Sequence, residues 1–480
     1  MKSLGALPQV RLTVDGAPLD AAASAALATV RVQQRLCLPA LCELTFSGQT
    51  VLTGIAATPL SVGSTLELRV EDDELLFAGD ITAVEYSSRV DTGRVIRVRA
   101  YDALHRLRRA QPVKAHTNIT AAALARELVA PLNVDAAEEG RTIERWVQHR
   151  QNDLDFLTEV CARSGLYFVV DGDTLRLFRL QSSDAVELDL GETLLEARID
   201  LTEPIVRSVS VRGWDPRRIA TLDTLLEREE GMLERTLTDE IVADTTHAEE
   251  VAAAEMERRE LALTPVWGVA IGDVRLRPGA TVTITGVTPE ASTAVITSVD
   301  HVLQRTTGFR SEFSNPLPQL HRSDRATVAA LGIVNNVDDP DRLGRIKLLL
   351  PAYGSVETEW LPVASAGAGT SKGFIAIPNA GDHVLALFPR GEPAQGIVIG
   401  SLFRDVHPDP CVRRFTFMTP NGQRLQLDDE RDAVRIENKT GSFVELTPEL
   451  MHIHAATDLD IEAPGRTITI RGKKIDFKRA

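Results

Sequence analysis

The sequence predicts a mainly β, multidomain chain whose last part is a β-helix intertwined from three copies. Three observations support this fold class. Short runs of alternating apolar and polar residues recur through the first 110 residues, as in half-buried strands. Residues 327–405 hold apolar runs separated by Gly, Pro, Asn and Asp, which is typical of a small closed barrel. From residue 415 onward, the chain shows period-two runs and turns with almost no helical pattern.

Composition places the chain among globular proteins. The 480 residues are 43% hydrophobic and 25% charged, which is ordinary for a folded chain with several cores. No apolar run approaches the roughly 20 residues of a membrane-spanning helix. Residues 1–16 lack the hydrophobic core of a secretion signal, so we expect no Sec export. The formal net charge of −15 argues against a nucleic-acid partner.

Cysteines and short motifs indicate no enzyme. No glycine-rich phosphate loop, GxSxG elbow or HExxH motif occurs, so we predict no catalytic residues. The acidic run at residues 428–432 lacks metal-ligand spacing and is interpreted as a solvated turn. The four cysteines form no CxxC pair and are too few for a disulfide framework. We expect them to be reduced and mostly buried: Cys37, Cys42, Cys161 and Cys411.

Strands are expected first, at residues 9–14, 66–70 and 94–99, where apolar and polar residues alternate. The period then changes to that of a helix over residues 120–128. Thr117 or Asn118 is the candidate N-cap of that helix, and Pro131 follows its expected end.

A second helix is expected over residues 153–164, where Leu154 and Leu157 fall on one face and Gly165 ends the pattern. Strands at residues 166–170 and 174–178 follow, joined by an Asp-Gly-Asp turn that predicts a hairpin.

The middle of the chain is mixed and locally acidic. A helix is expected over residues 246–261, with strands at 281–284 and 294–299. Residues 225–260 carry 12 Asp and Glu against 4 Arg, a local net charge of −8. A solvated helical face is the favoured interpretation, and a docking or repulsive surface is the alternative. Linkers are expected at residues 315–318 and 407–410.

The barrel is expected to use strands at residues 346–350, 374–377, 383–388 and 396–400. The segment after it cannot bury a core within one chain, because its strands are short and its length is only about 65 residues. Three identical chains wrapped around one axis solve this problem and predict a homotrimer. Expected strands include residues 459–463, 467–472 and 474–477. The expected inward residues are Leu425, Leu427, Val434, Ile436, Leu459, Ile461, Ile468 and Ile470.

His452 and His454 form the one candidate metal site. Residues i and i+2 of a strand point the same way, so an inward orientation would place six imidazoles around the axis of a trimer. Such a cage suits iron or another transition metal. In the alternative, Met451 and Ile453 point inward and both histidines face solvent.

The barrel segment resembles the oligonucleotide/oligosaccharide-binding (OB) domain of contractile-tail spike proteins, the VgrG and phage baseplate hub-spike family. Two positions depart from the family pattern: His383 replaces a common Glu, and Glu392 replaces Asp in a Gly-Asp-Pro motif. The matching residues are Gly332, Val334, Asp339, Pro340, residues 343–347, Trp360, Phe374, Ile377, Pro378, residues 381–384, Phe388, residues 391–393 and residues 399–402.

The first 320 residues resemble the hub region of the same family. The motifs are F-x-G-x-I at residues 77–81, YD-x-x-H-x-L at 101–107, and a helix-and-strand pattern at 152–157 and 165–168. Pro278 and Gly279 match a strand entry of the family. The chain is therefore most similar to the fused spike of an extracellular contractile injection system, and a type VI secretion VgrG spike or effector carrier is the alternative.

This resemblance implies three domains: a tube-docking hub at 1–320, an OB collar at 327–405 and a trimeric β-helix spike at 411–480. It implies a structural, membrane-puncturing function and, as partners, the inner tube protein, baseplate proteins and a PAAR-type tip protein at the C-terminal end. It also implies assembly in the bacterial cytoplasm and incorporation in a phage tail-like particle that reaches a target cell envelope. Only about ten residues, 404–414, separate barrel and needle, too few for a lysozyme domain.

Overall fold

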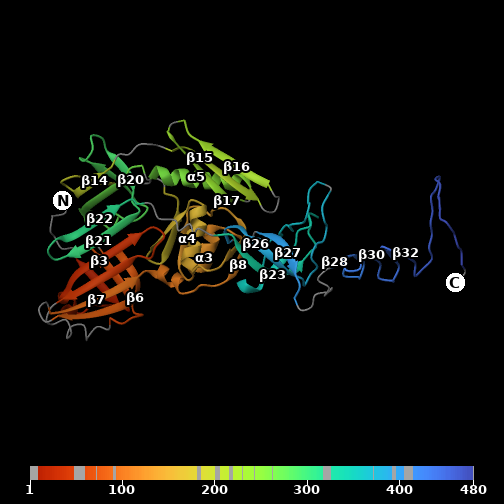
Figure 1. Ribbon diagram of the computed structural model, residues 1–480. Helices are drawn as coiled ribbons and strands as arrows, with labels where there is room; N and C mark the ends of the chain where they lie inside the picture. Colours follow the sequence, from red (N-terminus) through yellow and green to blue (C-terminus); the bar gives the residue numbers. More distant parts are fainter. Residues whose placement is uncertain are drawn as a thin grey trace. The chain divides into compact units, whose positions relative to one another are not determined.

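The computed structural model describes residues 9–47, 60–71, 73–89, 93–180, 185–200, 206–215, 220–229, 231–242, 244–261, 263–316, 326–370, 372–391, 396–404 and 414–478. The chain divides into two compact units, Met1–Leu402 and Phe403–Ala480. Strands are the most common regular elements in the first unit, and within the described residues of the second unit strands alone occur, without helices (Figure 1). The predicted mainly β, multidomain fold class is confirmed. The predicted linker at 407–410, the second half of the linker at 315–318 and Cys411 lie outside the described residues.

An eleven-stranded sheet joins the first hundred residues to residues 194–314. The two parts meet where β3 pairs antiparallel with β21, with Val32 opposite His301. The strands expected at 9–14, 66–70 and 94–99 are confirmed as β1, β5 and β7. In sheet order, the strands are β14 (Leu194–Ile199), β18 (Val266–Ile271), β22 (Gly308–Ser314), β21 (Ser298–Gln304), β3 (Leu27–Arg35), β4 (Leu41–Ser47), β7 (Gly93–Tyr101), β6 (Glu74–Arg89), β5 (Thr65–Val70), β1 (Val10–Val14) and β2 (Ala17–Pro18).

Both helices of the next region are confirmed, but the first has a different N-cap. The side chain of Thr120 accepts a hydrogen bond from Ala123 N at 3.1 Å and so begins α3 (Ala121–Leu128). Thr117 and Asn118, the residues proposed as caps, instead lie in β8 (Lys114–Ile119), which pairs with β10 (Ile143–Gln148). The short helix α1 (Ala21–Ala26) and the 3-10 helix η1 (Ala103–Arg108) precede these elements.

The second helix, α4 (Asp153–Arg163), begins at Asn152, whose side chain accepts a hydrogen bond from Asp155 N at 2.9 Å. Gly165 follows its end at a φ of 66°, a left-handed conformation that glycine adopts readily. The hairpin is confirmed as β11 (Tyr167–Asp171) and β12 (Thr174–Phe178), and β12 also pairs with β9 (Asn133–Ala136). The buried apolar face of α4 packs into the core that these strands share.

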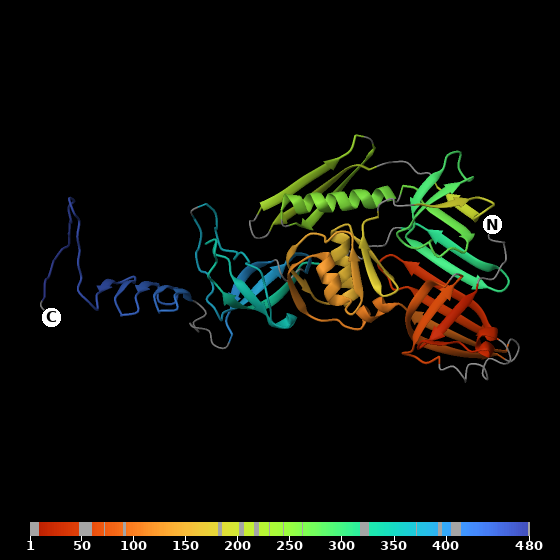
Figure 2. The ribbon, with the colours of Figure 1, turned by 180° about the vertical axis from the view of Figure 1, so that it is seen from behind.

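Helix α5 (Thr245–Leu261) lies along one face of a three-stranded sheet, as both ribbon views show (Figures 1 and 2). The sheet consists of β16 (Ala220–Glu227), β15 (Val206–Asp215) and β17 (Leu233–Ile241). Val209 and Val211 of β15 contribute to the core that Ala252 and Met256 of the helix complete. This confirms the helix expected at 246–261.

The strand expected at 294–299 is two strands. β20 (Ser292–Val295) pairs with β19 (Thr281–Thr285), which also pairs with β13 (Ala185–Asp189), and β21 begins at Ser298. Between them, Ile296 N still donates to Ala280 O, whereas Thr297 N donates to Ser314 O. The chain changes hydrogen-bonding partner at this point, so one continuous apolar run forms strands in two sheets.

The barrel region contains a five-stranded antiparallel sheet around a core that includes Val334, Leu348, Val384 and Phe388. The strand expected at 374–377 is wrong. Phe374 N donates to Ala366 O, and the segment makes no ladder within the described residues. In sheet order, the strands are β25 (Val356–Glu357), β24 (Lys347–Leu350), β23 (Val328–Asn336), β26 (His383–Phe388) and β27 (Ile397–Leu402), with 3-10 helices η2 (Pro351–Tyr353) and η3 (Pro389–Gly391).

The second unit contains an antiparallel sheet whose five strands follow one another along the chain. The strands expected at 459–463, 467–472 and 474–477 are absent from the described residues of the single chain. A strand requires a hydrogen-bonded neighbour, and these segments have none within the described residues of the single chain. The five strands are β28 (Arg414–Met418), β29 (Arg424–Asp428), β30 (Ala433–Glu437), β31 (Phe443–Leu446) and β32 (Met451–His454).

Candidate functional site: an assembly surface

The C-terminal sheet has one apolar face, built by the register of its five strands. Side chains alternate between faces along a strand, and residues paired across strands share a face. Leu425 pairs with Phe417 on one side and Ile436 on the other, and the same alignment continues to Ile453. Each strand contributes two residues to this face: Phe415, Phe417, Leu425, Leu427, Val434, Ile436, Val444, Leu446, Met451 and Ile453.

This apolar face is open to solvent in the single chain. Phe415 is 67% exposed and Ile436 55% exposed. A contiguous row of large apolar side chains on a soluble protein marks an interaction surface. Four of these residues, Leu425, Leu427, Val434 and Ile436, were predicted from the sequence to share the inward face.

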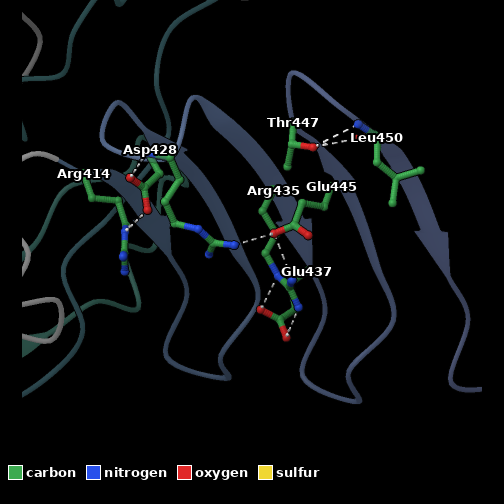
Figure 3. A network of polar contacts seen from close by, with 8 residues as sticks. Arg414, Asp428, Arg435, Glu437, Glu445, Thr447 and Leu450 are labelled. Atoms are coloured by element: carbon green, nitrogen blue, oxygen red, sulfur yellow. Dashed lines mark hydrogen bonds and ion pairs between the residues drawn. The ribbon is translucent and has the colours of Figure 1, made fainter.

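The opposite face satisfies its own charges. Arg435 donates to Glu437 at 3.2 Å and to Glu445 at 3.3 Å (Figure 3). Its guanidinium also lies 3.8 Å from the centroid of the Phe443 ring. Arg414 likewise donates to Asp428 at 3.1 Å. The hydrogen bond from Arg435 lowers the pKa of Glu437. Because these groups are paired within one chain, this face needs no protein partner and suits contact with water.

The two candidate metal ligands lie on this charged face. His452 is opposite Glu445 and His454 opposite Phe443, and the ring of His454 stacks on that of Phe443 with 5.0 Å between centroids. The two imidazole centroids are 6.1 Å apart, so the sequence correctly placed them on one side of a strand. It is the other residues of the strand, Met451 and Ile453, that belong to the apolar face.

These positions do not fit an inward metal site if the apolar face is the one shared between copies. The imidazoles would then point away from the axis, which is the alternative that the sequence left open. The described residues contain no group of three or more His, Cys, Asp or Glu side chains arranged to hold a metal ion. Metal binding at His452 and His454 stays a prediction.

The tail after β32 carries the remaining predicted inward residues. Leu459, Ile461, Ile468 and Ile470 are all exposed in the single chain. Their alternation with polar neighbours has period two, as in strands, although none is paired here.

The acidic run at 428–432 is only partly a solvated turn. Asp428 is buried, accepts hydrogen bonds from Glu430 N and Arg431 N, and pairs with Arg414. Asp428 therefore stabilises the turn between β29 and β30, and the prediction of a solvated turn holds only for the exposed residues 429–432.

Part of the acidic segment at 225–260 is paired with arginines inside the chain. Glu255, with a buried side chain, pairs with Arg235, Arg258 and Arg259. Other carboxylates of the segment pair with arginines outside it, as Asp244 does with Arg141 at 2.6 Å. These ion pairs attach α5 to its surroundings. They argue against a docking surface that covers the whole segment. They also show that the predicted solvated face is only partly correct, because several of its carboxylates are paired.

The collar contains a buried ion pair that sequence reasoning missed. Arg345 donates from Nη2 to Asp339 at 2.6 Å, and the side chain of Asp339 is 3% exposed. Asp339 also accepts backbone hydrogen bonds from Leu343 at 2.8 Å and Asp341 at 3.1 Å. Hydrogen bonding by Arg345 holds the pKa of Asp339 well below its usual range. Both residues belong to the motifs that resemble the OB domain of the family, but the sequence analysis did not predict that they pair.

Three of the four cysteines are described, and all three are buried and free. Burial raises the pKa of the Cys37 thiol to about 12, so it stays protonated and unreactive at neutral pH. Their reduced, buried state agrees with the prediction. No helix in the described residues is long and apolar enough to cross a membrane.

Comparison with protein families gives two matches along the chain. Residues 42–307, more than half of its length, match the family described as phage tail baseplate hub (GPD). Residues 330–403 match the type VI secretion system/phage-baseplate injector OB domain.

Two curated relatives match parts of the chain. The type VI secretion system spike protein VgrG4b of Pseudomonas aeruginosa is 29% identical over 165 residues, which are 32% of this chain and 19% of that protein. The actin cross-linking toxin VgrG1 of Vibrio cholerae is 28% identical over 132 residues, 25% of this chain and 11% of that protein. The chain thus aligns with less than a fifth of either relative's length.

Solved structures show the same fold at low identity. A 43 kDa tail protein of prophage MuSo2 from Shewanella oneidensis has a TM-score of 0.52 at 15% identity, covering 65% of this chain and 99% of its own. An E. coli type VI secretion component, similar to the T4 bacteriophage tail proteins gp27 and gp5, has a TM-score of 0.54 at 15% identity, covering 82% and 99%. A Francisella PdpA-VgrG complex has a TM-score of 0.56 at 8% identity, covering 95% and 81%.

Proposed function

Because the chain belongs to the phage tail baseplate hub family, we propose that it is the central spike of a contractile injection system. In this proposal three copies form one particle component that caps the inner tube, organises the baseplate and punctures the target envelope. A hub-spike protein is a structural component that assembles with other tail parts. We add that it acts as three copies and that these puncture the envelope.

The main support for a trimer is the apolar face of the C-terminal sheet. Ten apolar residues lie in continuous register on it, and the opposite face pairs its charges internally. A sheet with one apolar and one charged face buries the apolar one. Burial against identical copies gives a closed assembly with no free apolar surface.

We assign residues 1–320 to a tube-docking hub, 327–405 to an OB collar and 411–480 to the spike. The inner tube protein and the baseplate proteins are the proposed partners of the hub. Nucleic acid is not among the partners, since the chain carries a net charge of −15. The particle is assembled in the bacterial cytoplasm and then released or delivered to a target envelope.

A PAAR-type tip protein is the proposed partner at the C-terminal end. Ile468, Ile470, Ile475 and Phe477 are exposed there in the single chain. Once three chains have paired, the last strands of the needle end in open backbone groups and apolar side chains, and a cap covers such an end.

The work of penetration comes from contraction of a sheath, so the proposed function requires no catalytic residue. A type VI secretion spike or effector carrier is the second candidate, favoured by the similarity to the Pseudomonas spike protein. Neighbouring genes separate the two: an AAA+ ATPase and tail fibres accompany the extracellular device, and a membrane complex accompanies type VI secretion.

Particle assembly tests the proposal directly. We expect that deleting this gene from a producing strain leaves no intact contractile particles, and that the full chain restores them. A chain without residues 415–480 should fail to restore them because it lacks the trimerising sheet. Intact, puncturing particles made without this protein would refute the proposed function.

Elemental analysis of the assembled protein tests the metal prediction. An inward site at His452 and His454 predicts about one transition-metal ion per three chains. The outward orientation, which the register favours, predicts no such stoichiometry. Replacing both histidines with Gln serves as the control for metal bound elsewhere.

A further inference from the structure

One end of a two-stranded ribbon in the hub contacts the collar of the same chain. The ribbon consists of β8 and β10, which pair antiparallel with Lys114 opposite Gln148. Val113 and His149 are the next residues along each strand, so they lie next to each other at this end. Arg145 lies on β10, three residues before Gln148. Hub and collar belong to one compact unit of the chain.

Two packing contacts place this end against η2 of the collar. The ring of His149 meets that of Tyr353 nearly edge-on, with 5.5 Å between centroids, and both residues are buried. A Cβ added at Gly354 would lie 3.9 Å from the Cβ of Val113, so the two segments are in van der Waals contact. A contact between domains as small as this one leaves their relative orientation free unless specific groups determine it.

Arg145 supplies such groups. Its side chain is 14% exposed, and its Nε lies 3.0 Å from Oε1 of Glu359. Its Nη2 lies 4.0 Å from Oε2 of Glu357, and its Nη1 donates a hydrogen bond to the backbone oxygen of Glu357. The guanidinium is planar and its donors have fixed directions, so several contacts of this kind determine an angle as well as a distance.

The carboxylate of Glu357 is held in place by the collar itself. It accepts hydrogen bonds from Asn335 Nδ2 at 2.6 Å and from Lys347 Nζ at 3.4 Å, on β23 and β24. A group that its neighbours already hold loses little conformational freedom when it binds. The collar therefore offers Arg145 a preorganised acidic site on the edge of its sheet.

We propose that Arg145 is the positioning residue that holds the collar in one orientation on the hub. The inference rests on the proposed function, in which the hub receives the thrust of the contracting sheath and the collar carries the spike. A collar held at a constant angle transmits this thrust along the spike, whereas a collar that turns on its small contact does not.

A disulfide across the contact measures how the collar sits. Val113→Cys and Gly354→Cys are combined in the full-length chain in a Cys411→Ser background, which leaves three native thiols, all buried. The Cβ separation of 3.9 Å lies within the range of about 3.5–4.5 Å that a disulfide requires. Mild oxidation should therefore cross-link the two positions within one chain. Because Gly354 has a φ of 65°, which cysteine adopts less readily than glycine, circular dichroism checks the fold.

The rate of cross-linking reports the role of Arg145. Arg145→Glu should slow it at least about tenfold, because three carboxylates then repel one another across the contact. Adding Glu359→Arg restores the ion pair in reverse and should restore the rate, which a general loss of stability would not do. Arg141→Glu is the matched control and should leave the rate unchanged. The Arg141 side chain is 22% exposed and pairs with Asp244 inside the hub.

Particle assembly gives a second readout. In the strain that lacks this gene, the Arg145→Glu chain should restore at least about tenfold fewer intact particles than the wild-type chain, because a turned collar misaligns the spike. The chain that also carries Glu359→Arg should restore them. Normal particle numbers with the Arg145→Glu chain would overturn the role of Arg145 in the particle.

The outcomes separate this inference from the proposed function. An unchanged cross-linking rate in Arg145→Glu, or a rate that Glu359→Arg does not restore, overturns the positioning role and leaves the spike proposal intact. A cross-link that joins two chains on a denaturing gel also overturns it, because the contact would then lie between copies. Particles that form without this protein refute the proposed function, whatever the cross-linking rate.

Discussion

Asp339 and Arg345 connect the two ends of the loop between β23 and β24. The carboxylate accepts hydrogen bonds from the guanidinium and from the backbone N–H groups of Asp341, Leu343 and Arg345. A buried charge with this many donors is stable only while all of them stay in place. The pair therefore fixes the loop between β23 and β24.

Replacing Asp339 with Asn should destabilise the collar by about 3 kcal/mol, because the buried guanidinium of Arg345 then keeps only the exposed carboxylate of Asp341 as its charged partner. Asp341→Asn is the matched control. Its carboxylate pairs with the same guanidinium at 2.6 Å but is 66% exposed, so the loss should stay below about 1 kcal/mol. Calorimetric unfolding of both variants measures the difference, and equal losses would contradict the assigned role of Asp339.

The same pair predicts a direction for acid sensitivity. The pKa of Asp339 is held below the value of about 3.9 that an unfolded Asp has, so its stabilisation is complete above that pH. The stabilisation is lost as the pH falls below about 4. Calorimetry between about pH 5 and pH 3 should show a smaller acid loss in Asp339→Asn than in the wild type. A parallel decline in both proteins would contradict the shifted pKa.

Residue-level chemistry was only partly predictable from the sequence. Period two correctly placed His452 and His454 on one side of a strand, but it does not tell which side is buried. The register with Val444 and Glu445 on the neighbouring strand places both histidines on the charged face. The pairing of Asp339 with Arg345 depends on the path of the loop, which alternation does not encode.

At the level of elements, the C-terminal sheet is the part whose chemistry demands a partner. Ile436→Asp places a carboxylate on the proposed shared face, where burial without a partner costs several kcal/mol. We expect this variant to stay monomeric at about 1 μM when the wild type is assembled. Gln426→Asp, on the charged face of β29, should assemble normally. Sedimentation of the two variants decides, and an assembled Ile436→Asp would show that the face is not shared.

Helices and strands were predicted correctly where local sequence signals are strong. Errors arose where a segment changes its hydrogen-bonding partner or has none. The helices α4 and α5 and the hairpin β11–β12 formed as expected because caps, period and turn residues agree. The run at 294–299 was divided because its hydrogen-bonding partner switches between Ile296 and Thr297. The apolar run at 374–377 lacks a neighbouring strand, and apolar content alone does not make a strand.

For the whole molecule, the sequence predicted the order hub, OB collar and needle, and the fold class and family are confirmed. The single chain leaves the apolar face of the C-terminal sheet open to solvent. The proposed trimer accounts for this face, because it would bury these apolar residues between copies. The period-two pattern predicted which apolar residues share a face. The sequence of one chain does not show which surface covers that face.

The mass of the purified full-length chain in solution tests the central claim most directly. The trimeric spike predicts a single species of about 157 kDa, three times the 52.3 kDa of one chain, that persists on dilution to about 1 μM. A stable species of 52.3 kDa at that concentration would contradict it.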